Sequence, residues 1–379
     1  MRVAQGTVVW GCLFALLGTA LACRFNVRDV GFVDLGSQQY RFYCLIDEST
    51  PPETATAIKE ISAAAFFNTN VEPEVVFAAA AKAADWYQLA GSPVPPAGVL
   101  VSPDGSRALA LPLVSEGEDI QDTLWTHMEA VFESPTRAVV LTKAVNTYGV
   151  IMLVEGNDAA ENARVQSMAQ SVIKRVQGSL GELEKAIENP PVLHVLSNEE
   201  AAAEKVFLWS LGIDAETRTE PIFSVIYGRG RQIGQVLKGS DIEEKRLSNI
   251  LRTIGLDCEC GLDRSWMQGP MMPLKWDSDR QAVVANQLGF DAEDPMIKME
   301  MSQILSKGVQ ARRARKPDEV DELLADYQVP MPVEKMQETD VIQTSQDSKN
   351  TLGYLVLGGV LILVLATGSV ILLRSRSQN

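Results

Sequence analysis

The chain has 379 residues, which is about two to three times the length of a typical domain. It carries 34 Lys and Arg against 49 Asp and Glu, a formal net charge of −15. This balance argues against a nucleic-acid binder, because phosphate groups need a basic surface to neutralise them. Hydrophobic residues make up 46% of the chain, which excludes wholesale disorder. Only two histidines are present, so histidine-based metal sites and catalytic triads have few candidates.

The first 22 residues have the pattern of a secretory signal peptide. Arg2 precedes an apolar run that ends in small residues at Ala22. We therefore predict cleavage after Ala22. Two alternatives stay open: residues 19–23 also form a loose lipoprotein box in which Cys23 would be lipidated, or the segment would remain as an uncleaved anchor.

The other end of the chain predicts a transmembrane helix. Residues 354–373 are 20 positions without a charge, enough for a helix to cross a bilayer core of ~30 Å. Arg374 and Arg376 follow at once, and positive flanking residues stay in the cytoplasm. We therefore expect residues 23–353 to lie outside the cytoplasm, with a short cytoplasmic tail at 374–379.

Two distant segments share one hairpin pattern. Pro96 and Pro221 each precede an apolar run, and a glycine nine residues later, Gly105 or Gly230, marks the turn into a second run. Glycine suits a hairpin turn that requires positive φ. We interpret the two segments as a weak internal repeat.

Both copies of the repeat predict the element order β-α-β-α-β-β-α. In the second copy we expect strands at 150–154 and 192–196, a hairpin after Pro221, and helices at 158–178, 197–211 and 240–255. These helices are expected to begin with capping boxes at Asp158/Glu161, Ser197/Glu200 and Ser240/Glu243. In the first copy we expect strands at 42–46 and 70–72, a hairpin after Pro96, and helices at 53–66, 75–90 and 118–132.

This order resembles the thioredoxin-like fold, as one or two units over residues 35–255. In that family a proline, usually cis, precedes the first hairpin strand, and Pro96 and Pro221 stand in that place. The resemblance implies an α/β fold with helices on both faces of a small mixed sheet. The family's redox cysteines lie where the first strand meets the first helix, but residues 47–51 and 155–159 contain no cysteine. The resemblance therefore implies the fold without the oxidoreductase activity, since no thiolate nucleophile is present there.

The candidate thiol sites are Cys23, Cys44, Cys258 and Cys260. Cys44 alternates with Phe42 and Ile46 along one strand, which predicts a small core residue. Cys258 and Cys260 follow a helix end, and in an extended segment both thiols would point the same way. A structural disulfide is the leading expectation in an oxidising compartment; redox or metal chemistry and inert thiols stay open.

Eight of the 12 methionines fall in residues 267–336, and thioethers with thiolates form a Cu(I)-type ligand set. However, a helix opened by Pro295 would place Met299 and Met301 ~200° apart, so they could not share one ion. Met301 would line an ordinary apolar face. No metal site and no cofactor are therefore expected.

The remaining polar candidates have simpler interpretations. Arg229 and Arg231 flank the glycine of a hairpin turn and are expected to be exposed charges. His127 in a helix and His194 in a strand have no evident partner and are expected to be structural. No spacing of carboxylates singles out an acid/base pair.

These observations together predict a single-pass membrane protein with an extracytoplasmic α/β region. The expected boundaries are a signal peptide at 1–22, a first unit at 23–135, a second unit at 136–260, a helical extension at 261–307, a charged tether at 308–353, the transmembrane helix at 354–373 and the tail at 374–379. The expected function is a non-catalytic interaction or assembly module with protein partners in the cell envelope. The alternatives are a thiol or copper-handling protein that uses Cys258 and Cys260, and an envelope enzyme of another kind.

Overall fold

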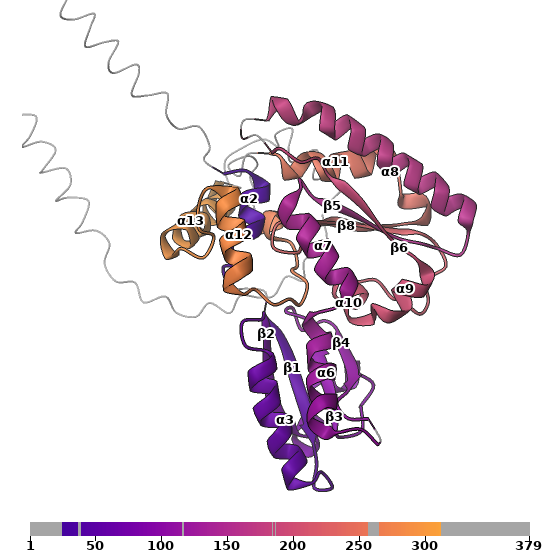
Figure 1. The fold of residues 1–379 in the computed structure, drawn as a ribbon, viewed down its shortest axis with the longest axis vertical. Helices are drawn as coiled ribbons and strands as arrows, with labels where there is room; N and C mark the ends of the chain where they lie inside the picture. Colours follow the sequence, from indigo (N-terminus) through magenta and orange to yellow (C-terminus); the bar gives the residue numbers. More distant parts are fainter. Residues whose placement is uncertain are drawn as a thin grey trace, which may run out of the picture. The chain divides into compact units, whose positions relative to one another are not determined.

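The computed structural model describes residues 25–36, 39–115, 117–183, 185, 187–256 and 265–311, drawn in colour in Figure 1. The predicted signal peptide, the charged tether beyond residue 311, the predicted transmembrane helix and cytoplasmic tail, and Cys23, Cys258 and Cys260 lie outside these residues. Within the described ranges, no helix is both long and apolar enough to cross a membrane.

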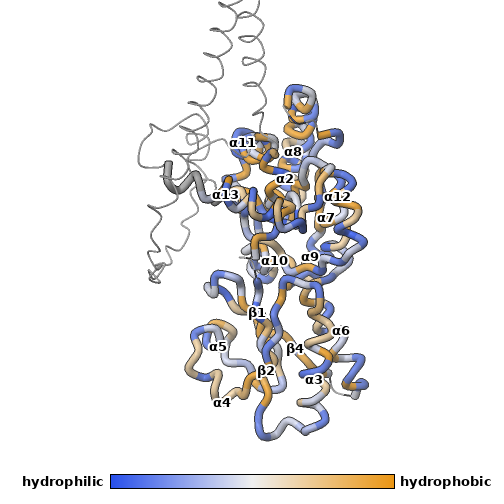
Figure 2. The backbone as a smooth tube through the Cα atoms, turned by 90° about the vertical axis from the view of Figure 1, so that its left-hand side faces the viewer, coloured by the Kyte–Doolittle hydropathy of each residue, from blue (hydrophilic) through white to orange (hydrophobic). Residues whose placement is uncertain are grey.

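The first unit contains a four-stranded mixed sheet with the order β2-β1-β3-β4. Strands β1 (Tyr40–Ile46) and β2 (Val71–Phe77) run parallel, whereas β3 (Ala97–Val101) pairs antiparallel with β1, and β4 (Ala108–Pro112) antiparallel with β3. Figure 2 shows apolar segments in and around these strands. Helices α3 (Pro52–Ala65) and α6 (Ile120–Phe132) pack together against one face of the sheet, and the short α4 (Ala78–Ala81) and α5 (Asp85–Leu89) cover part of the other.

The second unit repeats this topology with the strand order β6-β5-β7-β8. Strands β5 (Val150–Val154) and β6 (Val192–Leu196) are parallel, and β7 (Ile222–Tyr227) and β8 (Arg231–Lys238) complete the sheet antiparallel. Helices α8 (Ala159–Ser179) and α11 (Glu244–Ile254) lie on one side of the sheet, and α7 (Pro135–Asn146) with α9 (Asn198–Ala203) and α10 (Lys205–Ser210) on the other (Figure 1). The tandem α/β architecture predicted from the repeat is therefore confirmed.

Most local predictions in the hairpins and caps are confirmed. Gly105 and Gly230 have φ of 69° and 64°, as the predicted hairpin turns require. Ser197 and Glu200 form the predicted capping box of α9. The box predicted at Asp158 and Glu161 is only half formed: Asp158 caps α8 by accepting hydrogen bonds from the next turn, whereas the Glu161 carboxylate accepts from Arg164. The box predicted at Ser240 and Glu243 is wrong, because Ser240 lies in a separate 3-10 turn (Gly239–Asp241) and Glu243 makes no side-chain capping bond.

Two predicted helices differ from the structure. The helix expected at 75–90 is wrong at its start, because residues 75–77 continue β2 in full register with β1. The helix expected at 197–211 breaks at Glu204, between α9 and α10. The buried Glu204 carboxylate accepts hydrogen bonds from Ser134 Oγ (2.6 Å) and Thr136 N (3.1 Å) at the start of α7, which draws the chain inward at that point.

The N-terminal segment packs with the second unit, although the predicted boundaries group it with the first. Helix α2 (Val27–Phe32) shares the core of the second sheet, and all six of its residues are buried. Val27 N donates to Leu256 O at 2.8 Å. Arg28 donates to Val145 O (2.7 Å) and Thr147 O (2.9 Å), where α7 ends. No local apolar periodicity marks α2, because every side is covered.

The predicted helical extension contains α12 (Ser278–Leu288) and α13 (Pro295–Ala311), which runs past its expected end at Lys307. Before them, residues 269–276 form an extended segment, here named the strap, that hydrogen-bonds to both units. Gln232 N donates to Pro270 O (2.8 Å) in the second unit, and Trp276 N donates to Asn68 O (2.8 Å) in the first. The Asn70 side chain adds bonds to Met272 O (3.0 Å) and Leu274 N (2.8 Å). The strap therefore joins the two units.

The expectation that Arg229 and Arg231 are exposed is wrong, because both are buried at the tip of the β7–β8 hairpin. Arg231 donates to Gly31 O (3.1 Å), Val33 O (3.1 Å) and Gly269 O (3.2 Å). The Arg229 guanidinium lies 4.4 Å from the centre of a tryptophan ring of the strap and pairs with the carboxylates of Asp34 (3.9 Å) and Glu293. Segments from both ends of the described chain cover this turn, so its local sequence could not indicate burial.

We expect Arg231→Met to lower the free energy of unfolding by about 3 kcal/mol. Methionine keeps much of the side-chain volume but removes three hydrogen bonds from a fully buried guanidinium to backbone carbonyl groups. Hydrogen bonds to charged groups contribute about 1.5–3 kcal/mol each, and the cost of burying the charge offsets part of this sum. The measurement is the urea midpoint of the purified full-length chain. Arg175→Met is the control: its side chain is 59% exposed and its ion pair with Glu244 should contribute under about 1 kcal/mol. Equal effects of the two changes would contradict a structural role for Arg231.

Candidate functional site

The strand order brings corresponding loops to one end of each sheet. In the first unit Ile46 and Phe77, the last residues of β1 and β2, lie side by side, and Ala97 at the start of β3 pairs with Leu45. In the second unit Val154 lies between Leu196 and Ile222 in the same way. This sheet end, here named the junction end, holds the strand-to-helix junction and the proline of each unit.

The junction of the first unit is a turn closed by its own polar side chains. Asp47 Oδ1 accepts hydrogen bonds from Ser49 N (3.0 Å) and Ser49 Oγ (2.7 Å), and Asp47 N donates to Thr50 Oγ1 (3.0 Å). The hydrogen bonds from Ser49 and Thr50 lower the pKa of the Asp47 carboxyl. The turn therefore presents a carboxylate and hydroxyl groups, with no nucleophilic thiol.

The junction of the second unit is closed around Gly156. The Asn162 side chain bonds both Gly156 N (2.8 Å) and Gly156 O (3.0 Å), and Asn198 Nδ2 donates to the same carbonyl at 3.0 Å. A Cβ on residue 156 would stand 2.6 Å from the backbone C of Glu220 and N of Pro221. No side chain fits at this point, so the position is sterically closed as well as free of thiols.

The prolines differ between the two units. The Pro95–Pro96 peptide bond is cis, whereas the bond before Pro221 is trans, so the expected cis bond is wrong there. Two backbone hydrogen bonds hold the chain around Pro221: Asn157 N donates to Thr219 O at 2.8 Å, and Gly239 N donates to Pro221 O at 3.0 Å. These bonds align the trans chain with β7.

Cys44 is the only cysteine among the residues that the structure describes. It lies within β1 and not in the junction turn. It is fully buried in the same core cluster as Phe42 and Ile46, as the alternation in β1 predicted. Burial raises the pKa of the Cys44 thiol to about 12. The thiol therefore stays protonated at neutral pH and is a poor nucleophile.

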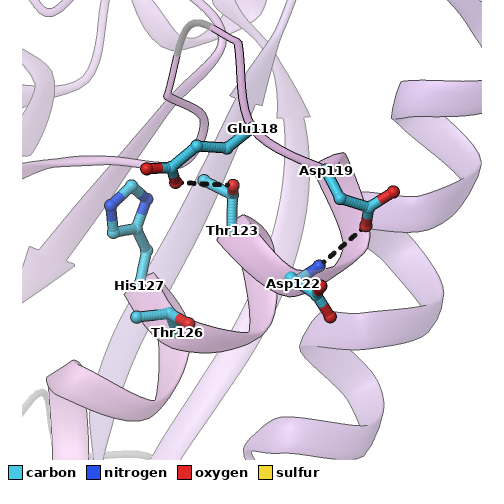
Figure 3. Close-up of a pocket in the computed structure, with 6 residues that line it drawn as sticks. All are labelled: Glu118, Asp119, Asp122, Thr123, Thr126 and His127. Atoms are coloured by element: carbon cyan, nitrogen blue, oxygen red, sulfur yellow. Dashed lines mark hydrogen bonds between the residues drawn. The ribbon is translucent and has the colours of Figure 1, made fainter.

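A surface pocket of about 310 Å³ lies at the start of α6. Figure 3 shows the six residues that line it, Glu118, Asp119, Asp122, Thr123, Thr126 and His127. Asp119 Oδ1 caps the helix by accepting from the backbone N–H groups of residues 121 and 122, and Thr123 Oγ1 donates to Glu118 Oε2 at 3.2 Å. Within the described ranges, no group of three or more His, Cys, Asp and Glu side chains is placed to hold a metal ion.

The two histidines have different surroundings. His127 Nδ1 is buried and has no hydrogen-bond partner in the described part of the chain. His194 Nδ1 lies 3.1 Å from Lys143 Nζ, a partner from α7 that the strand sequence did not indicate. Burial and the neighbouring ammonium group lower the pKa of His194.

The described methionines between residues 267 and 301 have two kinds of surroundings. Met267, Met271, Met272 and Met301 are buried in the apolar core of the second unit. Met296 and Met299 are exposed on α13. The helical argument that separated Met301 from Met299 agrees with this placement.

Three exposed apolar residues occur in the segment that leads from the end of β2 to the start of β3, and the sequence analysis did not single them out. Phe77 at the end of β2 is 56% exposed, Leu89 in α5 is 52% exposed, and Val94 just before the cis proline is 82% exposed. We name these three residues the apolar rim. The local sequence signal for the apolar rim is Val94, which stands alone between Pro93 and Pro95.

No protein-family model and no curated protein sequence matches this chain. Eleven chains of known structure match. The first two thioredoxin domains of Saccharomyces cerevisiae Eps1p align with 11% identity over 57% of this chain and 92% of that chain, with a TM-score of 0.21. Zinc-bound human ERp44 aligns with 11% identity over 62% of this chain and 61% of its own, less than two thirds, with a TM-score of 0.22. The corresponding Naumovozyma dairenensis Eps1p domains give 9% identity, coverage of 58% and 91%, and a TM-score of 0.18.

The two Eps1p structures are of thioredoxin domains. The identification of the fold rests on the strand orders β2-β1-β3-β4 and β6-β5-β7-β8, with helices on both faces of each sheet.

We expect Gly156→Ala to lower the free energy of unfolding by about 1–3 kcal/mol, because the added methyl group would meet backbone atoms that cannot move aside independently. Gly178→Ala is the matched control: a Cβ there meets nothing within 4 Å, and alanine inside a helix should stabilise by about 0.5–1 kcal/mol. Thermal and urea unfolding of both variants measure the difference. A neutral Gly156→Ala would show that the junction is open.

Proposed function

We propose that this chain is a membrane-anchored extracytoplasmic protein whose two thioredoxin-like units bind other proteins of the cell envelope without catalysing thiol–disulfide exchange. The observation that carries the non-catalytic part is the chemistry of the two junctions. One is a hydroxyl and carboxylate turn, and the other is closed around Gly156. Disulfide exchange requires an accessible thiolate, and neither junction offers one.

The apolar rim supports a binding role. Phe77 and Val94 come from strand and loop positions at the junction end, and both expose most of their side-chain surface. Large exposed apolar side chains at the end of a sheet can contribute to a protein contact when they form one patch. The apolar rim belongs to the first unit, and the strap joins this unit to the second one, where the buried arginines of the β7–β8 hairpin lie.

The membrane part of the proposal rests on the sequence alone. An uncharged run at 354–373 followed by two arginines is typical of a stop-transfer segment, and the first 22 residues have the pattern of a secretory signal. With this topology both units would stand outside the cytoplasm, where structural disulfides persist. Cys258 and Cys260 would then act structurally.

The competing thiol or copper function depends on the same two cysteines. Nearby thioethers offer it little support, because Met267, Met271 and Met272 are enclosed by apolar side chains. An assay of thiol–disulfide exchange therefore distinguishes the proposed binding function from the thiol alternative.

In an insulin-reduction assay with dithiothreitol, the purified full-length chain should give only the uncatalysed background rate. A variant with both Cys258→Ser and Cys260→Ser should be indistinguishable from it, because neither cysteine is expected to be a redox nucleophile. Turnover well above background that disappears in the double variant would replace the proposed function with the thiol alternative.

A photoreactive amino acid at Val94 should capture a discrete protein partner in intact cells, because Val94 lies on the apolar rim. The same residue placed at Val283, an exposed valine of α12 that is 49% accessible, is the matched control and should give no such product. The readout is the band pattern after irradiation, with product identity checked by mass spectrometry. Absence of a product at Val94, or the same products at both positions, would count against a binding surface there.

A further inference from the structure

The four sheet edges of the described units are protected unequally. Strand β2 contains Pro73 and strand β4 ends with Pro112, and proline blocks pairing because it has no N–H group. Strand β8 pairs with the strap at Arg231 and Gln232, and its register with β7 is interrupted further along. These are recognised ways to prevent edge-to-edge association.

Strand β6 has no proline within it and no second neighbouring strand in the described sheet, although Pro190 and Pro191 directly precede it. Its sequence, Val192-Leu193-His194-Val195-Leu196, contains no proline, glycine or acidic residue. Its first four side chains are half-buried, and in the described sheet its only neighbouring strand is β5. No residue of β6 is an acid, lysine or arginine, and burial and the Lys143 ammonium, 3.1 Å from His194 Nδ1, lower the pKa of His194.

The hydrogen bonds to β5 show which backbone groups of β6 remain for another strand. Val192 N donates to Gly149 O, and Leu196 O accepts from Glu155 N, both at 3.0 Å. Alternate residues of a strand turn their backbone groups to the same neighbour, so Val192, His194 and Leu196 face β5. Leu193 and Val195 therefore direct their N–H and C=O groups outward.

The outward groups are self-complementary about His194. If a second β6 approaches antiparallel with a two-fold axis at His194, Leu193 of one copy stands opposite Val195 of the other, and the reverse. Each of these two pairs can exchange two backbone hydrogen bonds. The same surface patch on both copies is the arrangement that a two-fold dimer requires.

We propose that β6 is a dimerisation edge: two copies of this chain pair their β6 strands antiparallel about His194, which joins two four-stranded sheets into one sheet of eight strands. The second copy is the occupant that fits, because the outward backbone groups of Leu193 and Val195 match those of a second β6 about His194. Helix α8 packs against β6 and Lys143 of α7 contacts His194, so backbone pairing is the contact that the outer edge offers.

The first test is the mass of the full-length chain in mild detergent, measured by analytical ultracentrifugation. The wild-type chain should sediment as a dimer. Val195→Pro should give a monomer, because proline removes an outward N–H group and leaves the pairing of β6 with β5 in place. Val195→Thr keeps that N–H group and is the matched control, which should remain a dimer. A monomeric wild type would mean that another strand or none occupies the edge, and would overturn the proposal, as would a dimer that survives Val195→Pro with its fold intact.

The second test does not depend on how well the proline variant folds. His194 faces itself across the two-fold axis, and residues directly opposite in a non-hydrogen-bonded pair have Cβ atoms about 4.5–5.5 Å apart. Under mild oxidation His194→Cys should therefore give a covalent dimer on a non-reducing gel. Val192→Cys, on the same strand but opposite Leu196 of the other copy, should give none beyond the level of the wild-type cysteines. Equal cross-linking of the two variants would overturn the arrangement about His194.

Discussion

The guanidinium of Arg231 connects three parts of the chain that are far apart in sequence. It is fully buried, and its donors reach Gly31 and Val33 near the N-terminal end of the described chain and Gly269 at the start of the strap. Burial lowers the pKa of Arg231, because a charged group loses its hydration there. The cost of burying this charge is offset only when every partner is in place, which couples the closure of the second unit to both flanking segments.

Other arginines act in the same way at helix ends. The last carbonyl groups of a helix lack intrahelical partners and carry partial negative charge, which a guanidinium can satisfy. Arg28 bonds the end of α7, Arg137 donates to Val131 O (2.6 Å) at the end of α6, and Arg107 donates to Trp209 O at the end of α10. Arg137 also donates to the strap at Pro273 O (3.2 Å). In a chain with a net charge of −15, these cations bind backbone carbonyl groups across the fold, and the two units become one structure.

This framework has a consequence for function. The junction ends hold no thiol, and the second is closed by backbone at Gly156, so the fold keeps the architecture of a redox domain without its reactive position. The first unit also exposes apolar side chains next to this end, Phe77 at the end of β2 and Val94 before β3, beside the polar turn at residues 47–50. At the edge of the second sheet, unpaired backbone groups of β6 offer another kind of contact. We propose a protein partner for the first surface and a second copy of the same chain for the edge.

The sequence by itself determined the features that depend on neighbouring residues. Gly105 and Gly230 marked hairpin turns because positive φ favours glycine, Ser197 and Glu200 marked a helix start, and the absence of cysteine from both junctions can be read directly. The alternation around Cys44 likewise predicted its burial, and the order of elements predicted a tandem thioredoxin-like fold. The apolar rim was not predicted, because Phe77 had been assigned to a helix.

Only the tertiary structure decided the features whose partners lie far along the chain. Arg231 follows a turn glycine and looks exposed, yet it is buried because segments some 200 residues earlier and about 40 residues later cover it. Glu204 breaks a continuous helical pattern because its carboxylate caps α7, whose first residues lie about 70 positions before it. The bond before Pro221 is trans because Asn157 and Gly239 fix the approach to β7. Local sequence encodes propensity, but burial and hydrogen-bond partners are set by which distant segments meet, and that is decided only when the chain folds.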